Sequence, residues 1–305
     1  MMNNIHNFRV FLDFYCKKNN ENIYYLGQNL DQELKYSDLI NIFQNFNIFL
    51  KKNKIRKKSK ILVILDNSVE LLLIFLSSLY NNIIFIPVNP NSGNEEINYI
   101  AKITKPSFLI TNKIFLKKAK KISFLKKYII KNDNFLKKIT RKNKNNNFKI
   151  KSSIGQNSEA QILFTSGSTG KPKGVVLTHK SMLTNLYGIN NSLNIKVKNP
   201  KFLSVTPLYH NNGQFIPTLL PFILNGSTIT TSPDTSLLNF WPISQKYKIN
   251  YSSVMATHIN YFNTLRKIKK HSLINLFCGG AKLDKQSQLK FEKKFKIKVL
   301  CNYGL

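Results

Sequence analysis

The chain has 305 residues, enough to bury a large hydrophobic core and to form one or two domains. Hydrophobic residues make up 42% of the sequence, a share typical of globular proteins, which argues against wholesale disorder. Lysine and arginine number 47 against 14 aspartate and glutamate, so the formal net charge is +33. Nucleic-acid-binding and membrane-surface proteins show such an excess, but no nucleic-acid-binding motif accompanies it. Lys, Asn and Ile are abundant along the whole chain, which also fits a compositional drift of the source genome.

The three cysteines, Cys16, Cys278 and Cys301, form neither a Cys-x-x-Cys pair nor a metal-binding spacing. An odd number of cysteines without a secretory signal indicates a reducing compartment, where cysteines are most often small buried residues. The first residues lack the basic head and apolar core of such a signal. The longest uninterrupted apolar run, residues 71–79, is too short to span a bilayer. We therefore expect a soluble cytoplasmic protein.

The first 111 residues alternate between helical and strand-like patterns. Apolar residues at helical spacing predict helices at 5–16, 36–50, 68–80 and 94–102. Short apolar runs predict strands at 23–26, 61–65, 83–90 and 107–111. Ser37 or Asp38 can cap the second helix, and Asn67 with Glu70 resembles a capping box for the third. This alternation predicts a layered α/β fold with a largely parallel sheet.

Residues 113–151 are the part of lowest complexity, rich in lysine and asparagine with a single acid, Asp133. Their apolar residues still predict a helix and a strand before Asn132, and residues 143–147 read as an exposed loop. We interpret the charge run as a solvated face rather than a nucleic-acid-binding stripe. We place a subdomain boundary here, with a first α/β subdomain at 1–150 and a second at 151–305.

Residues 164–174 read Phe-Thr-Ser-Gly-Ser-Thr-Gly-Lys-Pro-Lys-Gly, between apolar runs at 160–164 and 175–177 that predict short buried strands. Glycines let backbone N–H groups turn toward one anion, hydroxyls add donors, and lysines supply positive charge. A Walker A loop is excluded because Pro172 follows Lys171 where a hydroxyl is required. The register also excludes a Gly-x-Ser-x-Gly nucleophile elbow. The sequence predicts a phosphate-binding loop; the alternative is a polar turn between two strands.

The second half continues the alternation. Helices are predicted at 181–193, 215–224, 237–247, 259–267 and 284–295. Strands are predicted at 202–205, 227–230, 251–256, 276–278 and 299–301.

Two further motifs each follow a predicted strand. In Pro-Leu-Tyr-His, residues 207–210, His210 comes after a buried strand, at the edge of an open α/β sheet where ligands bind. Gly279, Gly280 and Ala281 follow another strand, and glycine lets a flat ligand approach the backbone closely. Taken alone, a histidine such as His210 is more often structural than catalytic, and the glycines read equally well as a tight strand-to-helix turn.

In their order along the chain, these motifs resemble the adenylate-forming (AMP-binding) superfamily. The resemblance rests on four elements: residues 164–174 followed by Leu-Thr-His, Pro-x-x-His at 207–210, Gly-Gly-Ala at 279–281, and Asn-Tyr-Gly at 302–304. It covers residues 30–305 and implies the layered α/β subdomains of that family's large N-terminal domain. It also implies an AMP-forming acid–thiol ligase of the acyl-CoA synthetase kind. Such an enzyme activates a carboxylic acid with ATP and Mg²⁺ to an acyl-adenylate and pyrophosphate, then transfers the acyl group to a thiol such as CoA.

The resemblance also assigns roles to residues of this sequence. The residues implied to bind the ATP phosphates are Thr165, Ser166, Gly167, Ser168, Thr169, Gly170, Lys171 and Lys173. His210 is the implied catalytic residue beside the carboxylate, with Asn211, Asn212, Gly213 and Gln214 on the same wall. The residues implied to form the adenine site are Gly279, Gly280, Ala281, Asn302, Tyr303 and Gly304, with Tyr303 stacked on the base. No metal ligand is predicted.

The sequence ends at Leu305, before the elements that follow Tyr-Gly in the family. These are a Thr-Glu element, a ribose-binding Asp, a hinge, and a mobile C-terminal domain with a catalytic lysine. We therefore expect a truncated or split chain, with a separate C-terminal fragment as a possible partner. Three alternatives stay open: a non-catalytic remnant, an adenylation domain that loads a carrier protein, and, least favoured, nucleic-acid binding through residues 113–151. The acid substrate stays open as well.

Overall fold

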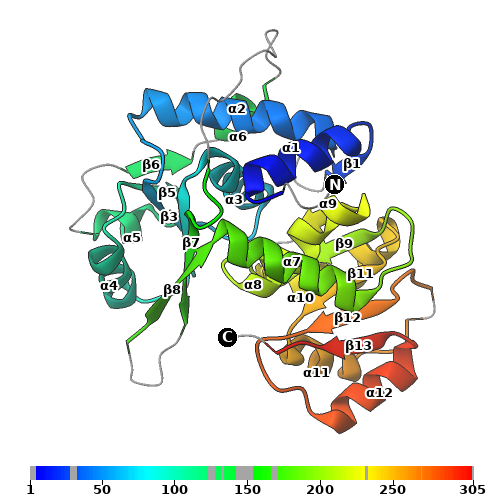
Figure 1. Ribbon diagram of the computed structural model, residues 1–305. Helices are drawn as coiled ribbons and strands as arrows, with labels where there is room; N and C mark the ends of the chain where they lie inside the picture. Colours follow the sequence, from blue (N-terminus) through cyan, green and yellow to red (C-terminus); the bar gives the residue numbers. More distant parts are fainter. Residues whose placement is uncertain are drawn as a thin grey trace. The chain divides into compact units, whose positions relative to one another are not determined.

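The computed structural model describes residues 5–27, 33–122, 128–131, 134–141, 154–165, 171–230, 233–268 and 270–303 (Figure 1). The chain separates into two compact units. Unit 1 consists of Met1–Glu21, Lys35–Asp66 and Glu70–Ser192; unit 2 consists of Asn22–Leu34, Asn67–Val69 and Leu193–Leu305. In the part of the chain that the structure describes, no helix combines the length and the apolarity needed to cross a membrane.

Unit 1 is built on a sheet of the order β6-β5-β3-β4-β7-β8, in which only β8 runs antiparallel to its neighbour. The strands are β3 (Lys60–Ile64), β4 (Ile84–Val88), β5 (Phe108–Asn112), β6 (Tyr128–Lys131), β7 (Glu159–Thr165) and β8 (Lys173–Thr178). The helices are α1 (Phe8–Lys18), α2 (Tyr36–Lys52), α3 (Val69–Asn81), α4 (Asn94–Thr104), α5 (Leu116–Lys120), α6 (Asn134–Thr140) and α7 (His179–Leu193).

Helices cover both faces of this sheet. On one face, Leu62 of β3 and Ile86 of β4 pack with Ile100 of α4 and Ala119 of α5. On the other face, the ring of Phe75 on α3 lies 5.2 Å from that of Phe85 on β4. Continuous apolar runs therefore form the central strands, because both sides of each strand are buried. The predicted layered α/β architecture with a largely parallel sheet is confirmed.

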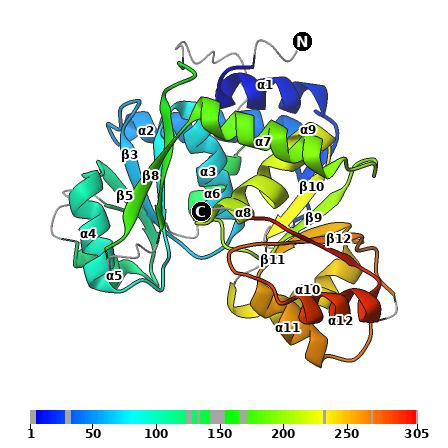
Figure 2. The same cartoon turned by 60° about the horizontal axis from the view of Figure 1, so that its bottom comes forward.

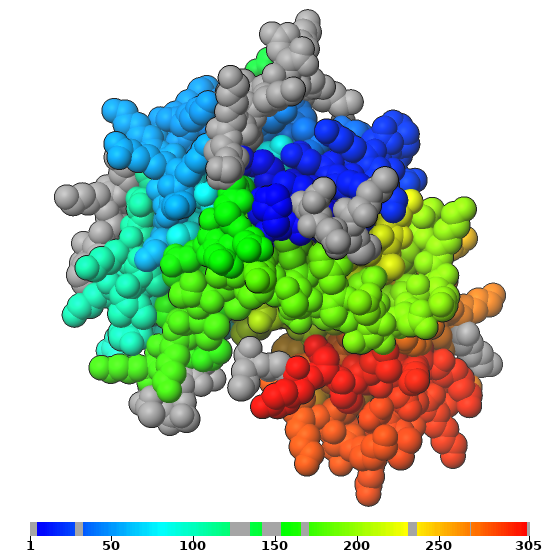
Figure 3. All heavy atoms as spheres, viewed as in Figure 1, coloured from blue at the N-terminus to red at the C-terminus, as the bar shows by residue number. Residues whose placement is uncertain are grey.

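Residues 175–177 were predicted to form a buried strand, and the prediction of burial was wrong. The strand is present as β8, but it pairs only with β7 and lies at the end of the sheet order. Val175 and Val176 are therefore 44% and 49% exposed. Figure 3 shows the green segment that contains β8 and α7 at the surface of unit 1. A short apolar run does not distinguish a central strand from an edge strand.

The compact units divide the chain differently from the predicted boundary at residue 150. β7 pairs with β4 through Phe85 and Gln161, and β8 pairs with β7, so the chain up to Ser192 belongs to unit 1. An early segment belongs to unit 2 because β1 (Ile23–Tyr25) pairs with β10 (Ser227–Thr230). The predicted helix and strand before Asn132 correspond to α5 and β6. The predicted loop at 143–147 lies outside the described residues.

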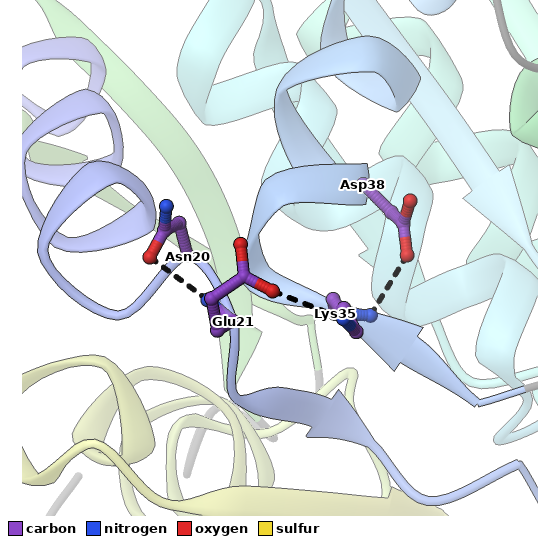
Figure 4. A network of polar contacts seen from close by, with 4 residues as sticks. All are labelled: Asn20, Glu21, Lys35 and Asp38. Atoms are coloured by element: carbon purple, nitrogen blue, oxygen red, sulfur yellow. Dashed lines mark hydrogen bonds and ion pairs between the residues drawn. The ribbon is translucent and has the colours of Figure 1, made fainter.

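A small polar network holds the start of α2 in unit 1 (Figure 4). Asp38 accepts a hydrogen bond from the backbone N–H of Lys35 (2.9 Å), and the Lys35 side chain forms an ion pair with Glu21 at 3.1 Å. The backbone N–H of Glu21 donates to Asn20. Asp38 thus satisfies a free backbone donor at the first turn of the helix, as the sequence predicted for this position.

Unit 2 is built on a second sheet, of the order β13-β12-β11-β9-β10-β1-β2, with parallel pairing from β13 to β1. Its further strands are β2 (Leu34–Lys35), β9 (Lys201–Ser204), β11 (Tyr251–Val254), β12 (Asn275–Cys278) and β13 (Lys298–Cys301). The helices are α8 (Asn211–Gln214), the π-helix η2 (Phe215–Leu219), α9 (Leu220–Leu224), α10 (Pro233–Lys246), α11 (Ala256–Thr264) and α12 (Lys285–Phe295).

The two faces of this sheet have different cores. Leu203 and Leu276 face α10, α11 and α12, which lie together on one side of the sheet in Figure 2. Phe202 and Tyr251 pack against each other on the opposite face, with tilted rings whose centroids lie 5.4 Å apart. The predicted helix 215–224 is present as η2 followed by α9. Pro217 lies within η2, and Pro221 lies in the first turn of α9, which continues η2 without a break.

Candidate functional site

The predicted site residues of unit 2 follow three strands of one parallel sheet. His210 follows β9, Gly279 follows β12, and Asn302 follows β13; β11 lies between β9 and β12. Since the strands are parallel, their carboxyl ends meet at one edge of the sheet, the edge at which open α/β sheets bind ligands. The fold thus brings three separate sequence motifs to one edge.

Gly279 and Asn302 are in direct contact. A Cβ atom at Gly279 would lie 2.7 Å from Oδ1 of Asn302, so the absence of a side chain at Gly279 lets the Asn302 side chain lie directly against this backbone. Backbone hydrogen bonds fix both residues: Asn302 donates to the carbonyl of Cys278 at 2.9 Å, and Gly279 donates to that of Val254 at 3.2 Å. Two motifs that are 23 positions apart in the sequence therefore form one surface.

The surface beside this contact is open. Gly280 has a φ of +86°, a backbone conformation that favours glycine, and Ala281 is exposed beside it. Tyr303 is 92% exposed, so its ring face is available for stacking. Gly304 lies outside the described residues. A glycine backbone next to an exposed aromatic ring can accept a flat heteroaromatic group.

Asn67 holds the segment that leads to His210. Its Nδ2 donates to the carbonyl of Thr206 at 3.0 Å, and its Oδ1 accepts from the N–H of Leu208 at 2.7 Å. The Thr206 hydroxyl also lies 2.8 Å from the Ser253 hydroxyl on β11. Sequence reasoning assigned Asn67 only a helix-capping role, since no local pattern signals a partner about 140 residues away.

Gly213 lets the short helix α8 lie directly on the same segment. A Cβ there would meet the carbonyl oxygen of Pro207 at 2.5 Å and that of Thr206 at 2.8 Å. The fully buried Gln214 donates from Nε2 to the carbonyl of Leu208 at 2.8 Å. The loop after β9 is therefore tied down on two sides, by Asn67 and by α8.

The His210 ring lies at the end of this fixed loop. It is exposed, and it packs edge-on against Tyr209 with centroids 4.8 Å apart. Partial desolvation lowers the pKa of His210 below its ordinary value. The imidazole is therefore neutral at pH 7, and each ring nitrogen can donate or accept a single hydrogen bond.

The predicted phosphate loop lies in unit 1, at the tip of the β7–β8 hairpin. Thr165, the last residue of β7, pairs in register with Lys173, the first residue of β8. Thr165 is half-buried, whereas Lys171 and Lys173 are exposed. Ser166, Gly167, Ser168, Thr169 and Gly170 lie outside the described residues. The hairpin thus carries two exposed lysines and a hydroxyl at its end.

Comparison with known proteins supports the sequence resemblance. The family described as AMP-binding enzyme matches residues 14–305. A 4-coumarate–CoA ligase-like protein of Arabidopsis thaliana is 24% identical, covering 94% of this chain and 53% of the relative. A luciferin 4-monooxygenase of Photuris pensylvanica is 26% identical over 84% of this chain and 50% of its own length. The chain thus spans about half the length of these curated relatives.

Solved structures of the same kind share the fold. The N-terminal domain of FACL13 from Mycobacterium tuberculosis superposes with a TM-score of 0.84 at 17% identity, covering 98% of this chain and 76% of that one. The O-succinylbenzoate–CoA synthetase MenE of Bacillus subtilis, solved with ATP and magnesium, gives 0.82 at 18% identity, covering 97% and 59%. The family match extends over nearly the whole sequence, and this chain therefore belongs to the AMP-binding enzyme family.

Proposed function

We propose that this chain carries the adenylate-forming half of an AMP-forming acid–thiol ligase. Such an enzyme joins a carboxylic acid to the AMP part of ATP, releases pyrophosphate, and passes the acyl group to a thiol such as CoA. The observation that carries the proposal is the meeting of His210, Gly279 and Asn302 at one edge of the parallel sheet of unit 2. They are the residues that the family resemblance selects.

In this proposal the adenine ring rests against Gly279 and Gly280 and stacks on Tyr303. The positive φ of Gly280 turns the backbone without a side chain in the way, and Tyr303 offers an exposed ring. Stacking of a base on an aromatic ring contributes about 1–3 kcal/mol. The backbone hydrogen bond from Asn302 to the carbonyl of Cys278, the residue before Gly279, holds the two sides of this surface at a fixed spacing.

The chemical step is the attack of a carboxylate oxygen on the α-phosphorus of ATP. The new bond joins that oxygen to phosphorus, and the bond between the α-phosphorus and the pyrophosphate oxygen breaks. Neutral His210 donates one hydrogen bond that orients the carboxylate without protonating it. The family resemblance assigns Lys171 and Lys173 of unit 1 to the ATP phosphates, and their positive charge is of the sign that offsets negative charge on a leaving pyrophosphate.

Family resemblance also implies a magnesium ion. Protein-bound Mg²⁺ typically takes one or two carboxylates together with phosphate oxygens. The described residues contain no group of three His, Cys, Asp or Glu side chains arranged to hold a metal ion. They offer no defined fit for the ion, so every step proposed for this chain uses its own side chains.

The test is ATP–pyrophosphate exchange by the 305-residue chain, driven by a panel of carboxylic acids. Exchange with at least one acid is the expected result. A double variant, Lys171→Gln with Lys173→Gln, should lose at least about tenfold in rate, since one charge-assisted interaction contributes about 1.5–3 kcal/mol. Lys102→Gln on α4, also exposed, is the matched control and should exchange at the unaltered rate.

Folded protein that exchanges with no acid contradicts the proposal. Calorimetry with ATP then decides between the alternatives. Binding of ATP without turnover identifies a non-catalytic remnant, whereas the absence of binding shows that the chain has no nucleotide site.

A further inference from the structure

Cys278 and Cys301 occupy paired positions at the ends of two neighbouring parallel strands. They are register partners at the last positions of β12 and β13. Neighbouring strands lie about 4.8 Å apart, and residues in register point to the same face of the sheet. Their proximity also has an electrostatic consequence, because burial and the Cys301 thiol together raise the pKa of Cys278 to about 11.

The two thiols differ in access. Cys278 is 2% exposed and packs in the core that faces α10, α11 and α12, whereas Cys301 is exposed. An oxidant in solution therefore reaches Cys301 first. The third cysteine, Cys16, is buried in α1 of unit 1.

We propose that Cys278 and Cys301 form a redox-active dithiol, which hydrogen peroxide oxidises to a reversible intramolecular disulfide. In the first step the Cys301 sulfur attacks the peroxide O–O bond, which gives a sulfenic acid and one water. In the second step the Cys278 sulfur attacks the Cys301 sulfur, the S–O bond breaks, and the hydroxyl leaves as a second water with the remaining thiol proton. Two thiols are thus oxidised by two electrons, and the peroxide is reduced to two waters.

Strand geometry permits this bond. Disulfides join residues whose Cα atoms are about 4.4–6.8 Å apart, a range that includes the spacing of neighbouring strands. Their Cβ atoms must approach to about 3.8 Å, slightly closer than in an undistorted sheet. β13 can supply this movement because it is the edge strand and Cys301 is its last residue. A disulfide that requires such an adjustment is readily reduced, the property of labile rather than structural disulfides.

The bond would act on the surface described for unit 2. Gly279 and Asn302 directly follow the two cysteines, and the Asn302 N–H donates to the Cys278 carbonyl. A disulfide would fix the end of β13 to β12 and so hold Asn302 against Gly279. This effect is independent of the proposed function, because it concerns the backbone of the two strands.

The test uses the whole 305-residue chain. After treatment with hydrogen peroxide, free thiols are alkylated and the protein is digested for mass spectrometry. The expected product joins the peptides of Cys278 and Cys301 with the loss of two hydrogen atoms, and dithiothreitol releases it. In hydrogen exchange, the Asn302 amide should become better protected after oxidation.

Three variants sharpen this test. Cys16→Ser is the matched control and should form the linkage in full. Cys301→Ser should lose it completely. In Cys278→Ala the sulfenic acid of Cys301 has no partner, so dimedone should label Cys301 there and leave the wild-type protein unlabelled. The proposal is overturned if Cys301 proceeds to sulfinic acid in the wild-type chain, or links two copies of the chain, while Cys278 keeps a free thiol.

Discussion

The two units place their candidate residues in different ways. In unit 2, His210, Gly279 and Asn302 follow parallel strands, and buried contacts fix the loops that carry them. In unit 1, Lys171 and Lys173 lie exposed at the end of a hairpin whose outer strand is the edge of its sheet. In unit 2, packing fixes the positions of the candidate residues. In unit 1, the hairpin mainly supplies positive charge and hydrogen-bond donors.

This difference separates the expected effects of substitution. Substituting a residue that holds one of the unit 2 loops should lower folding stability and, at the same time, displace the site residues that the loop carries. Altering the exposed lysines of unit 1 should change ligand binding and leave stability nearly constant, because surface substitutions seldom change stability by more than about 0.5 kcal/mol.

The largest effect is expected at Asn67. Asn67→Leu is similar in size but leaves the buried N–H of Leu208 without its partner, and it removes one of two hydrogen bonds to the carbonyl of Thr206, which also accepts from the Ser204 hydroxyl. The unsatisfied N–H costs about 1–3 kcal/mol and the lost hydrogen bond to Thr206 about 0.5–1.5 kcal/mol, so the free energy of unfolding of unit 2 should fall by about 3 kcal/mol. Denaturant unfolding, monitored through hydrogen exchange of the amides in β9 and β11, measures this loss of stability.

Asn53→Ala in unit 1 is the matched control. Asn53 is half-buried and makes one side-chain hydrogen bond, to the carbonyl of Phe49 at 2.9 Å. Its loss should lower the free energy of unfolding by about 1 kcal/mol. Equal losses in the two variants would show that Asn67 does not support the loop.

Each unit also contains a buried histidine that should make its stability depend on pH. Desolvation, and then the charge of Arg9, lowers the pKa of His179 in unit 1 to about 4 from 6.5. Desolvation alone lowers the pKa of His258 in unit 2 to about 4 from 6.5. Between these values the unfolded chain takes up a proton that the folded chain does not. The contribution of each histidine to the free energy of unfolding is therefore fully present above pH 6.5. About 3 kcal/mol of stability is lost for each histidine as the pH falls to 4.

Asparagine replacements assign this effect to one unit at a time. The Nδ1 atoms of His179 and His258 accept backbone hydrogen bonds from Phe8 and Met255, and an asparagine oxygen can replace each acceptor without titrating. His179→Asn should flatten the pH dependence of unit 1 alone, and His258→Asn that of unit 2 alone, in hydrogen exchange at pH 7 and pH 4. An unaltered pH profile in either variant would refute the assignment for that unit.

A pair of glycines compares the packing of the two units directly. Gly213→Ala in unit 2 forces a Cβ against two backbone carbonyls, and such overpacking costs about 1–3 kcal/mol. Gly188→Ala, inside helix α7 of unit 1, meets nothing within 4 Å and should stabilise the helix by about 0.5–1 kcal/mol. Thermal unfolding should therefore shift in opposite directions. Shifts of the same sign would contradict the structure at one of the glycines.

The sequence predicted much of this fold because its strands are continuous apolar runs and its helices have clear periodicity. The runs at 61–65 and 276–278 became β3 and β12 nearly as expected. Pairing partners were less predictable: the exposure of Val176 depends on β8 being last in its sheet, which no local pattern encodes. The division between the units likewise depends on long-range strand pairs such as Tyr25 with Thr228.

For the candidate site, sequence reasoning selected residues but not their supports. The motifs named His210, Gly279 and Asn302, and parallel topology explains why they share an edge. Asn67 was missed as a support because its partners, Thr206 and Leu208, are distant in the sequence. Contacts of this kind appear only when the chain is folded.

The most direct test of the account is a calorimetric titration of the 305-residue chain with a non-hydrolysable acyl-adenylate analogue. Tyr303→Ala removes the exposed ring, whereas Tyr303→Phe keeps its stacking face. Since stacking contributes about 1–3 kcal/mol, Tyr303→Ala should weaken binding about tenfold. Tyr303→Phe should bind like the wild-type chain. Equal affinity in all three proteins would contradict the placement of the adenine ring at this edge of unit 2.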